Sequence, residues 1–286
     1  MTQRPGLLQK MFLNVCVILL LIYVFAPLAW LFISSISTRA ELLVIPPHWI
    51  PEQPTLQNYA DILFPGAETS RAAQDFGEAL GNSIIVSAAV TLISLVVGAL
   101  AAYAFARLTF PFRQSGLLAI VGLRMLPAVS VVIPLYVILR DLTLLNTRTA
   151  LVLLYLSFTL PFVIWVMTSF FLSLPRELED AARVDGCSRL GALWRVIIPI
   201  STPGLVATGV FAFLLAWDEF FFALLFTSTP IAKTVPVAIA EFTGRNAIDF
   251  SAQATGGVLA AIPPVVLALI FQRYIVRGLT AGAVKG

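Results

Sequence analysis

Residues 11–38 read MFLNVCVILLLIYVFAPLAWLFISSIST and contain no charged side chain. A helix that crosses a bilayer needs about 20 mostly apolar residues, so this run is long enough to span a membrane. The run also exceeds the apolar core of a typical signal peptide, and no small-residue cleavage site follows it. We therefore expect a retained membrane helix at the start of the chain.

The composition of the whole chain points the same way. Of the 286 residues 59% are hydrophobic and 12% are charged, and the mean hydropathy is +0.94. A soluble domain has about 25% charged residues. This argues against a soluble enzyme, a nucleic-acid-binding domain and a disordered protein. The net charge of +3 is therefore interpreted as a signal for membrane orientation.

Five more apolar segments follow the first, at about 79–106, 116–139, 149–175, 203–227 and 252–272. Long unbroken apolar runs favour helices over the short alternating strands of a membrane barrel. We predict an all-α integral membrane protein with six transmembrane helices. Residues 1–78 would hold the first span and a Pro-rich external loop at 39–78, and residues 79–286 would hold the other five spans.

The distribution of basic residues predicts the orientation. An even number of spans puts both termini on one side, and the segments on that side carry 11 Lys and Arg residues against 6 on the other. Basic loops face the cytoplasm. We therefore expect both termini and the loop at 174–202 to be cytoplasmic.

The loop at 174–202, LPRELEDAARVDGCSRLGALWRVIIPIST, has a helical pattern of its own. Pro175 and the acidic residues after it favour a helix N-terminus, and Gly186 favours the end of that helix. Ser188 can cap a second short helix, which Pro199 is expected to end. The sequence thus predicts two short helices joined at a glycine.

The second of these helices has an apolar face, formed by Leu190, Leu193, Trp194 and Ile197 at helical spacing. Small residues line the pair of helices, and they allow another protein to approach the backbone closely: Ala181, Ala182, Gly186 and Gly191. This composition suits a helix that docks in a partner's groove. An amphipathic connector lying on lipid is the alternative, and composition alone slightly favours it.

The residue order in this loop resembles the EAA coupling motif of ATP-binding-cassette (ABC) importer permeases. The stretch 180–182, Asp-Ala-Ala, stands at the family's EAA, and Asp185-Gly186 follows at the family's spacing. Nine residues later, 196–199 (VIIP) stands at the family's I-x-L-P. Aspartate replaces the usual glutamate at position 180, and the other replacements keep apolar character.

Two further stretches resemble carbohydrate permeases of this family. Residues 278–286, GLTAGAVKG, look like the GLTxGxVKG tail of maltose-transporter permeases. Residues 217–220, Trp-Asp-Glu-Phe, are similar to the W-N-E-F of the fifth span, with Asp218 in place of asparagine.

The resemblance implies a permease subunit of an ATP-driven importer for a sugar or a related polyol or glycoside. A permease of this family has no ATPase of its own, and the absence of a Walker A motif agrees with this. The resemblance thus implies a chain that is no enzyme and binds no cofactor, with ATP and Mg²⁺ in a separate ATPase. The implied partners are a second permease subunit, a cytoplasmic ATPase dimer, an external solute-binding protein and the lipid bilayer, and no nucleic acid. The implied location is the cytoplasmic membrane of a bacterium or archaeon. Which permease subunit holds the sugar contacts stays open.

The resemblance assigns coupling to the ATPase to six residues of the loop: Asp180, Ala181, Ala182, Asp185, Gly186 and Pro199. Gly186 would allow a tight reversal that Asp185 fixes by accepting backbone hydrogens, and a plain helix stop is the alternative. Asp180 would pair with a cation of the ATPase or simply favour the helix N-terminus. The tail at 278–286 would insert between the two ATPase subunits, or would be a disordered end.

Three charges fall within predicted spans: Arg124, Asp218 and Glu219. Each costs about 2.5–3.5 kcal/mol at a helix centre on insertion scales, so each should face protein or water. A structural ion pair and a place on the solute pathway both fit, and Arg124 and Asp218 differ in depth by roughly 10 Å. We favour the pathway for Glu219. Trp217 could stack on a sugar, although packing or an interfacial belt is the more ordinary role.

Two other classes of protein compete with the importer. A secondary transporter would use Arg124, Asp218 and Glu219 to relay protons or bind ions, but such proteins usually have paired repeats and broken helices, and no repeat is evident. A membrane-embedded enzyme would need a nucleophile–base set, which is missing. The single histidine, His48, is expected in an exposed loop, and with two distant cysteines it forms neither a metal site nor a disulfide framework.

Overall fold

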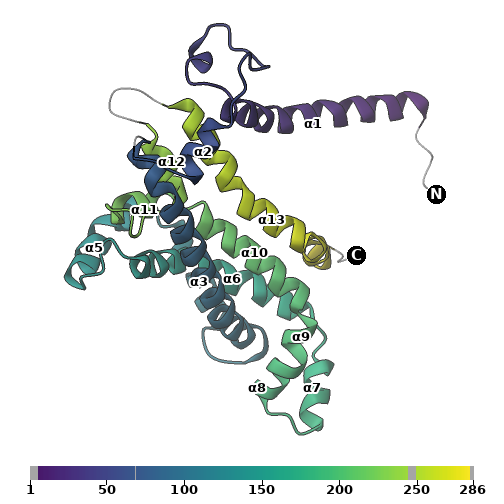
Figure 1. Cartoon of the computed structure of the whole chain (residues 1–286). Coiled ribbons are helices and arrows are strands. Elements are labelled where there is room, and N and C mark those ends of the chain that lie inside the picture. Colours follow the sequence, from purple (N-terminus) through teal and green to yellow (C-terminus); the bar gives the residue numbers. More distant parts are fainter. Residues whose placement is uncertain (1–5, 68, 244–248, 284–286) are drawn as a thin grey trace. The chain divides into compact units, whose positions relative to one another are not determined.

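The structure is a computed structural model that describes residues 6–67, 69–243 and 249–283. Every regular element of this described part is a helix (Figure 1). The chain divides into two compact units, one formed by residues 1–77 and 239–261, the other by 78–238 and 262–286. The all-helical class expected from the apolar runs is therefore confirmed.

Four helices are long and apolar enough to cross a membrane alone, and the number rises to six if each of two bent helix pairs is one span. The four are α1 (Leu7–Ser35), α3 (Arg71–Arg107), α6 (Arg148–Ser173) and α13 (Phe250–Ala283). They contain the first, second, fourth and sixth apolar segments. α3 begins several residues before its apolar segment, within the loop expected at 39–78.

The third apolar segment is broken rather than straight. It consists of α4 (Arg113–Gly122), the short 3-10 helix η2 (Leu123–Met125) and α5 (Ala128–Asp141), and the two arms meet at 92°. Pro127 causes the break, because it lacks a backbone N–H and keeps the preceding residue out of the helical region. Leu126 accordingly has ψ 124°.

The fifth apolar segment is also interrupted. α10 (Thr202–Trp217) ends before Asp218, and a second short helix, α11 (Phe221–Phe226), follows. α10 is preceded by α8 (Arg189–Ala192), the π-helix η3 (Leu193–Ile197) and α9 (Ile198–Ile200), which bend into it by 78°. The second loop helix ends at Ile200, one residue after the Pro199 at which the sequence predicts its end, and the bend follows at Ser201.

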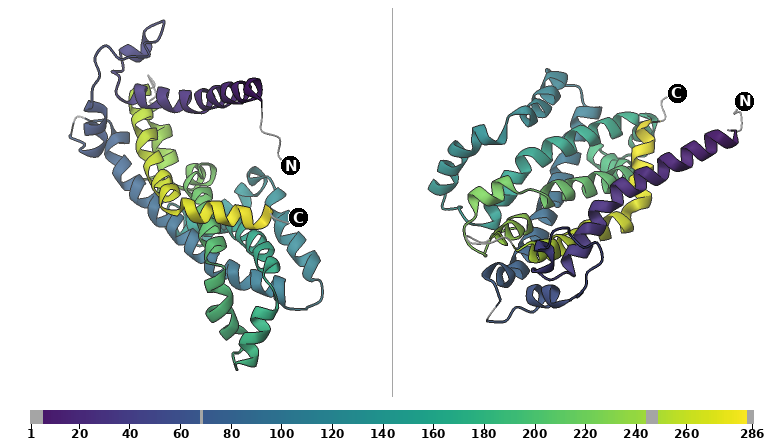
Figure 2. Two further views of the ribbon diagram at one scale, coloured as in Figure 1. Left: turned by 90° about the vertical axis from the view of Figure 1, so that its right-hand side faces the viewer. Right: turned by 90° about the horizontal axis from the view of Figure 1, so that it is seen from above.

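Glycines set the closest helix approaches in the second unit, where α3, α6 and α10 run side by side (Figures 1 and 2). A Cβ added at Gly98 of α3 would lie 2.6 Å from Cγ1 of Val163 on α6, and one at Gly204 of α10 would lie 2.6 Å from the ring of Phe170. Helices in a membrane gain stability from such close backbone approach, since lipid tails supply no hydrophobic drive.

Two asparagines hold the irregular segment that joins α11 to α12 (Val235–Glu241). The buried Asn82 donates to the carbonyls of Pro230 (2.8 Å) and Lys233 (2.9 Å), and its own oxygen accepts from Nε of Arg148 (2.7 Å). Oδ1 of Asn146 accepts from the backbone N–H groups of residues 228 and 229. These side chains supply the bonds that the irregular backbone lacks.

In the first unit, hydrogen bonds join the end of α1 to one helix that follows it closely and to one helix from the end of the chain. The Asn58 amide, in α2 (Gln57–Leu63), donates to the carbonyls of Ser35 and Ser37, and the Thr255 hydroxyl of α13 donates to Ser35 O at 3.2 Å. The loop between α1 and α2 carries the 3-10 helix η1 (Glu41–Leu43). His48 lies in this loop as expected, but its side chain is only partly exposed, at 35%, with Nδ1 3.8 Å from Oε1 of Glu41.

Candidate functional site

The loop predicted to couple to an ATPase forms a helical hairpin. Its first arm is α7 (Glu177–Val184), and its second arm is α8, which leads through η3 and α9 into α10. Figures 1 and 2 show this hairpin projecting beyond the end of α10. The Ser188 hydroxyl caps the second arm by accepting from the N–H of Gly191 at 3.1 Å, as the sequence predicts.

The turn of the hairpin is built around Gly186, which has φ +87°. The N–H of Cys187 donates to the carbonyl of Ala182 (3.0 Å) and the N–H of Gly186 to that of Arg183 (3.1 Å). This pair of bonds defines a Schellman motif, in which a left-handed residue follows the helix end. The helix stop predicted at Gly186 is therefore present.

The Asp185 carboxylate does not have the backbone hydrogen bonds expected of it. Its side chain is exposed, and within residues 6–67, 69–243 and 249–283 no backbone N–H donates to its carboxylate. The reversal is closed by main-chain bonds instead. The Asp185 carboxylate is therefore available to another molecule.

The hairpin divides into an inner and an outer face. On α7 the first alanine of the motif, Ala181, is exposed together with Asp180, whereas Ala182 is 6% exposed and packs inward. On the second arm Leu193 and Ile197 are fully buried. Two members of the apolar face predicted there, Leu190 and Trp194, are 60% and 53% exposed. The predicted face thus splits between core and surface.

Glu179 is a residue that the sequence reasoning missed. It is 9% exposed, and it accepts a hydrogen bond from the hydroxyl of Tyr103 at 2.6 Å. Nε of Arg107 lies 3.7 Å from its second oxygen. Helical spacing places Glu179 on the same face as Ala182, three residues on, and a buried acid needs a partner. That spacing was the sequence signal from which the burial of Glu179 could have been predicted.

The break in the fifth segment is capped by Glu219. Its Oε1 accepts from the N–H of Phe222 (2.8 Å) and its Oε2 from the N–H of Ala223 (3.2 Å). Both oxygens therefore satisfy the open N-terminus of α11, and the Tyr155 hydroxyl lies beside the same carboxylate. A carboxylate at this position is also favoured by the helix dipole.

Arg124 lies at the other break and forms no ion pair with Asp218 or Glu219 in the described part of the chain. Its guanidinium stands over the ring of Phe162 on α6, 5.5 Å from the centroid. One turn earlier on α6, the ring of Phe158 stacks on Phe222 at 6.4 Å. The two breaks therefore contact the same stretch of α6.

The aromatic and acidic residues around the break in the fifth segment differ in how exposed their side chains are. Trp217 is 3% exposed and stacks on Phe213 at 5.5 Å, so within this chain its ring serves packing. Asp218 and Phe220 are exposed beside it. Of the predicted pathway residues, Arg124 and Asp218 are the exposed charges.

The predicted C-terminal tail is helical as far as it is described. α13 continues to Ala283, and residues 284–286, including Lys285, lie outside the described residues. In the described part of the chain, no three His, Cys, Asp or Glu side chains gather as a metal site would require.

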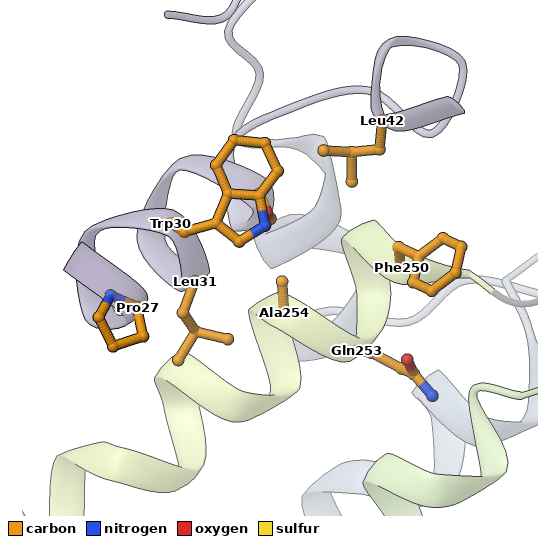
Figure 3. A pocket seen from close by; sticks show the side chains of 8 residues that line it. Pro27, Trp30, Leu31, Leu42, Phe250, Gln253 and Ala254 are labelled. Carbon is orange, nitrogen blue, oxygen red and sulfur yellow. The ribbon is translucent and has the colours of Figure 1, made fainter. Parts of the chain in front are cut away.

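A separate hollow lies within the first unit (Figure 3). It has a volume of about 410 Å³ and is lined by eight residues: Pro27, Trp30, Leu31, Ser34, Leu42, Phe250, Gln253 and Ala254. None of the sequence-predicted site residues is among them, and the lining is mostly apolar.

Comparison with known proteins defines the class. Residues 94–281 match the family described as binding-protein-dependent transport system inner membrane component. The chain is 40% identical over 260 residues to the sulfoquinovosyl glycerol transport system permease protein SmoH of Agrobacterium fabrum, covering 91% of this chain and 88% of the relative. It is 38% identical over 284 residues to the trehalose/maltose transport system permease protein MalG of Thermococcus litoralis, covering 99% of each.

The chain therefore belongs to this family of inner membrane components, and it is a permease subunit of an ABC importer. A solved structure described as a bacterial ABC transporter involved in the import of the acidic polysaccharide alginate has the same fold, with a TM-score of 0.77 and 21% identity over 96% of this chain and 99% of that one. The membership of the ABC importer permeases that the loop at 174–202 indicated is confirmed. The helix breaks, although typical of secondary transporters, occur here in an ABC permease.

Proposed function

We propose that this permease carries a sugar or a related polyol or glycoside across the cytoplasmic membrane of a bacterium or archaeon. The observation that carries the proposal is the near full-length similarity, at 38–40% identity, to permeases named for trehalose/maltose and sulfoquinovosyl glycerol transport. The tail at 278–286 and the Trp-Asp-Glu-Phe stretch at 217–220 support the same substrate class.

The proposed arrangement has six spans with both termini in the cytoplasm. Residues 79–286 form the transporter domain, 174–202 the coupling loop and 278–286 a tail that reaches the ATPase. The partners are a second permease subunit, an ATPase dimer that binds ATP and Mg²⁺, and an external solute-binding protein. One related alginate transporter was crystallised with a pentasaccharide-bound periplasmic protein, which supports the last of these.

The native cysteines test this orientation without any new label site. Cys187 is partly exposed in the hairpin, whereas Cys16 lies in the apolar α1. In chains prepared without the ATPase, a membrane-impermeant maleimide should label Cys187 in inside-out vesicles and not in right-side-out vesicles. A Cys187→Ser chain supplies the background. Labelling of Cys187 from the outside would contradict the six-span arrangement.

The outer face of the hairpin is suited to transmit movement from an ATPase. Leu190 and Trp194 offer apolar area, and Asp180 and Asp185 offer exposed acids beside it. Ala181 permits close approach, while Ala182 and Pro199 shape the backbone that holds this face. Closure of the ATPase dimer on ATP would shift the hairpin, and α10 continues directly from it into the membrane.

Replacing Gly186 with valine tests the coupling role. No atom lies within 4 Å of a Cβ added there, so the effect arises from the backbone alone. A left-handed conformation costs an L residue about 1–2 kcal/mol. Gly186→Val should therefore insert normally but weaken binding to the ATPase by roughly tenfold, measured by co-purification and ATP hydrolysis.

Gly186→Asn is the matched control, because asparagine tolerates positive φ. It should keep nearly normal binding and hydrolysis. Wild-type behaviour of Gly186→Val would remove the coupling assignment.

We further propose that the two helix breaks border the solute pathway. Arg124 and Asp218 are exposed where the backbone is irregular, and irregular backbone in a membrane is tolerated where it faces protein or a water-filled cavity. Trp217 and Glu219 hold the break in the fifth segment in place, because Trp217 stacks on Phe213 and Glu219 caps α11. A proton-driven transporter built on these charges would stop when a protonophore is added, whereas this importer should stop when its ATPase is inactivated.

A further inference from the structure

Glu179 is a buried acid on a helix whose neighbouring acids are exposed. The residue is 9% exposed, whereas Glu177 and Asp180 lie at the surface. A carboxylate can be buried without a large loss of stability only when it is paired and hydrogen-bonded. The burial of the Glu179 carboxylate therefore indicates that specific polar partners hold it.

The partners of Glu179 both come from the last turns of α3. The Tyr103 hydroxyl donates to Oε1 at 2.6 Å, and Nε of Arg107 stands 3.7 Å from Oε2. The Arg107 side chain is itself 3% exposed, and its Nη2 donates to the carbonyl of Leu174 at 3.0 Å. The end of α3 thus holds both the start of the hairpin loop and the first arm of the hairpin.

Apart from a longer bond from the Tyr103 hydroxyl to the carbonyl of Arg189 (3.4 Å), the other contacts between α3 and the hairpin within the described residues are apolar and have no fixed direction. Small side chains of α3, such as Ala102 and Ala106, share an apolar cluster with Leu193 and Ile197 of the second arm. Apolar burial depends on area and permits sliding. Charge-assisted hydrogen bonds fix both distance and direction, so the Glu179 cluster decides where α7 sits on α3.

We propose that Glu179 is a positioning residue that fastens the first arm of the hairpin to α3, so that movement imposed on the hairpin reaches this helix. This inference rests on the proposed coupling function. It adds a second route into the membrane besides the chain connection through α10. The exposed face of α7 is untouched by the attachment and stays free for the ATPase.

The test uses the complete complex in nanodiscs, in a chain whose two cysteines are replaced by serine. Spin labels are placed at Gly81 of α3, where an added Cβ meets no atom within 4 Å, and at the exposed Leu153 of α6. The probe is a non-hydrolysable ATP analogue, so no solute needs to be known. We expect the analogue to change the distance between the labels in the parent complex.

Glu179→Gln should leave ATPase co-purification intact but lower the fraction of complexes that change distance by about fivefold, the lower end of typical coupling strengths. Glu177→Gln removes an exposed acid from the same helix and is the matched control, with no expected effect. Tyr103→Phe keeps both charges and should show the same loss, which decides the question if Glu179→Gln does not accumulate.

The double variant Glu179→Gln, Arg107→Met separates positioning from folding. It leaves no unpaired buried charge, so the amount of folded protein should recover. The distance change should stay impaired. A normal distance change in Glu179→Gln and Tyr103→Phe, or its restoration in the double variant, would overturn the proposal while leaving the ATPase coupling of the hairpin intact. Failure of the parent complex to respond to the analogue would instead overturn the coupling function itself.

Discussion

Replacing Gly98 with leucine should prevent α3 and α6 from packing and should sharply reduce the amount of folded permease. Even the first added carbon would lie 2.6 Å from Cγ1 and 3.1 Å from Cβ of Val163, which is fully buried. Overpacking of a well-packed core costs typically about 1–3 kcal/mol and occasionally more. Size-exclusion yield and the thermal midpoint of the purified protein would measure the loss.

Gly81→Leu is the control, because it lies on the same helix and an added Cβ meets nothing within 4 Å. Shortening the opposing side chain gives a second check. Gly98→Ala alone should be destabilised, and Gly98→Ala with Val163→Ala should recover part of the loss. Normal yield and midpoint in Gly98→Leu would show that the helices do not approach as closely as described.

Replacing Glu219 with leucine should have a comparably large effect. Two backbone N–H groups, those of Phe222 and Ala223, would lose their acceptors inside the membrane, where each unsatisfied group costs several kcal/mol. Glu219→Gln keeps one acceptor oxygen and should give an intermediate amount of assembled complex. Co-purification with the partner subunits measures this directly.

Asp218→Asn separates capping from transport. Asp218 is exposed and ends α10 through its backbone N–H, which asparagine would keep, so its variant should assemble normally and change uptake alone if this residue borders the pathway. Equal assembly of Glu219→Leu and the wild type would contradict the capping role. Normal uptake by Asp218→Asn would remove this residue from the pathway.

The features that could be predicted from the sequence are those that depend on neighbouring residues alone. Apolar length indicated the membrane segments, and the turn residues Gly186 and Ser188 indicated the hairpin, because a left-handed turn and a helix cap need those side chains. The breaks near residues 126 and 219 were not predicted, because hydropathy reports the apolar character of a segment and not the direction of its backbone. Pro127 was the visible signal for the first, and a glutamate directly before an apolar helix was the signal for the second.

The attachment of Glu179 escaped prediction for another reason. Its partners Tyr103 and Arg107 lie more than 70 residues earlier in the chain. Only the packing of α3 against the hairpin brings them together. The ion pair that the sequence left open for Arg124 is not among the contacts of the described residues, where an aromatic ring on α6 lies beside its guanidinium instead.

The uninterrupted course of α3 contrasts with the broken third and fifth segments. Within the second unit α3 extends from residue 78 to Arg107, roughly 45 Å at 1.5 Å per residue. When a straight helix of this length tilts by about 5° around one end, its other end moves by roughly 4 Å. If an ATPase moves the hairpin as proposed, a small tilt at the Arg107 end of α3 would therefore move the other end of this helix by several ångströms without breaking any hydrogen bond inside it.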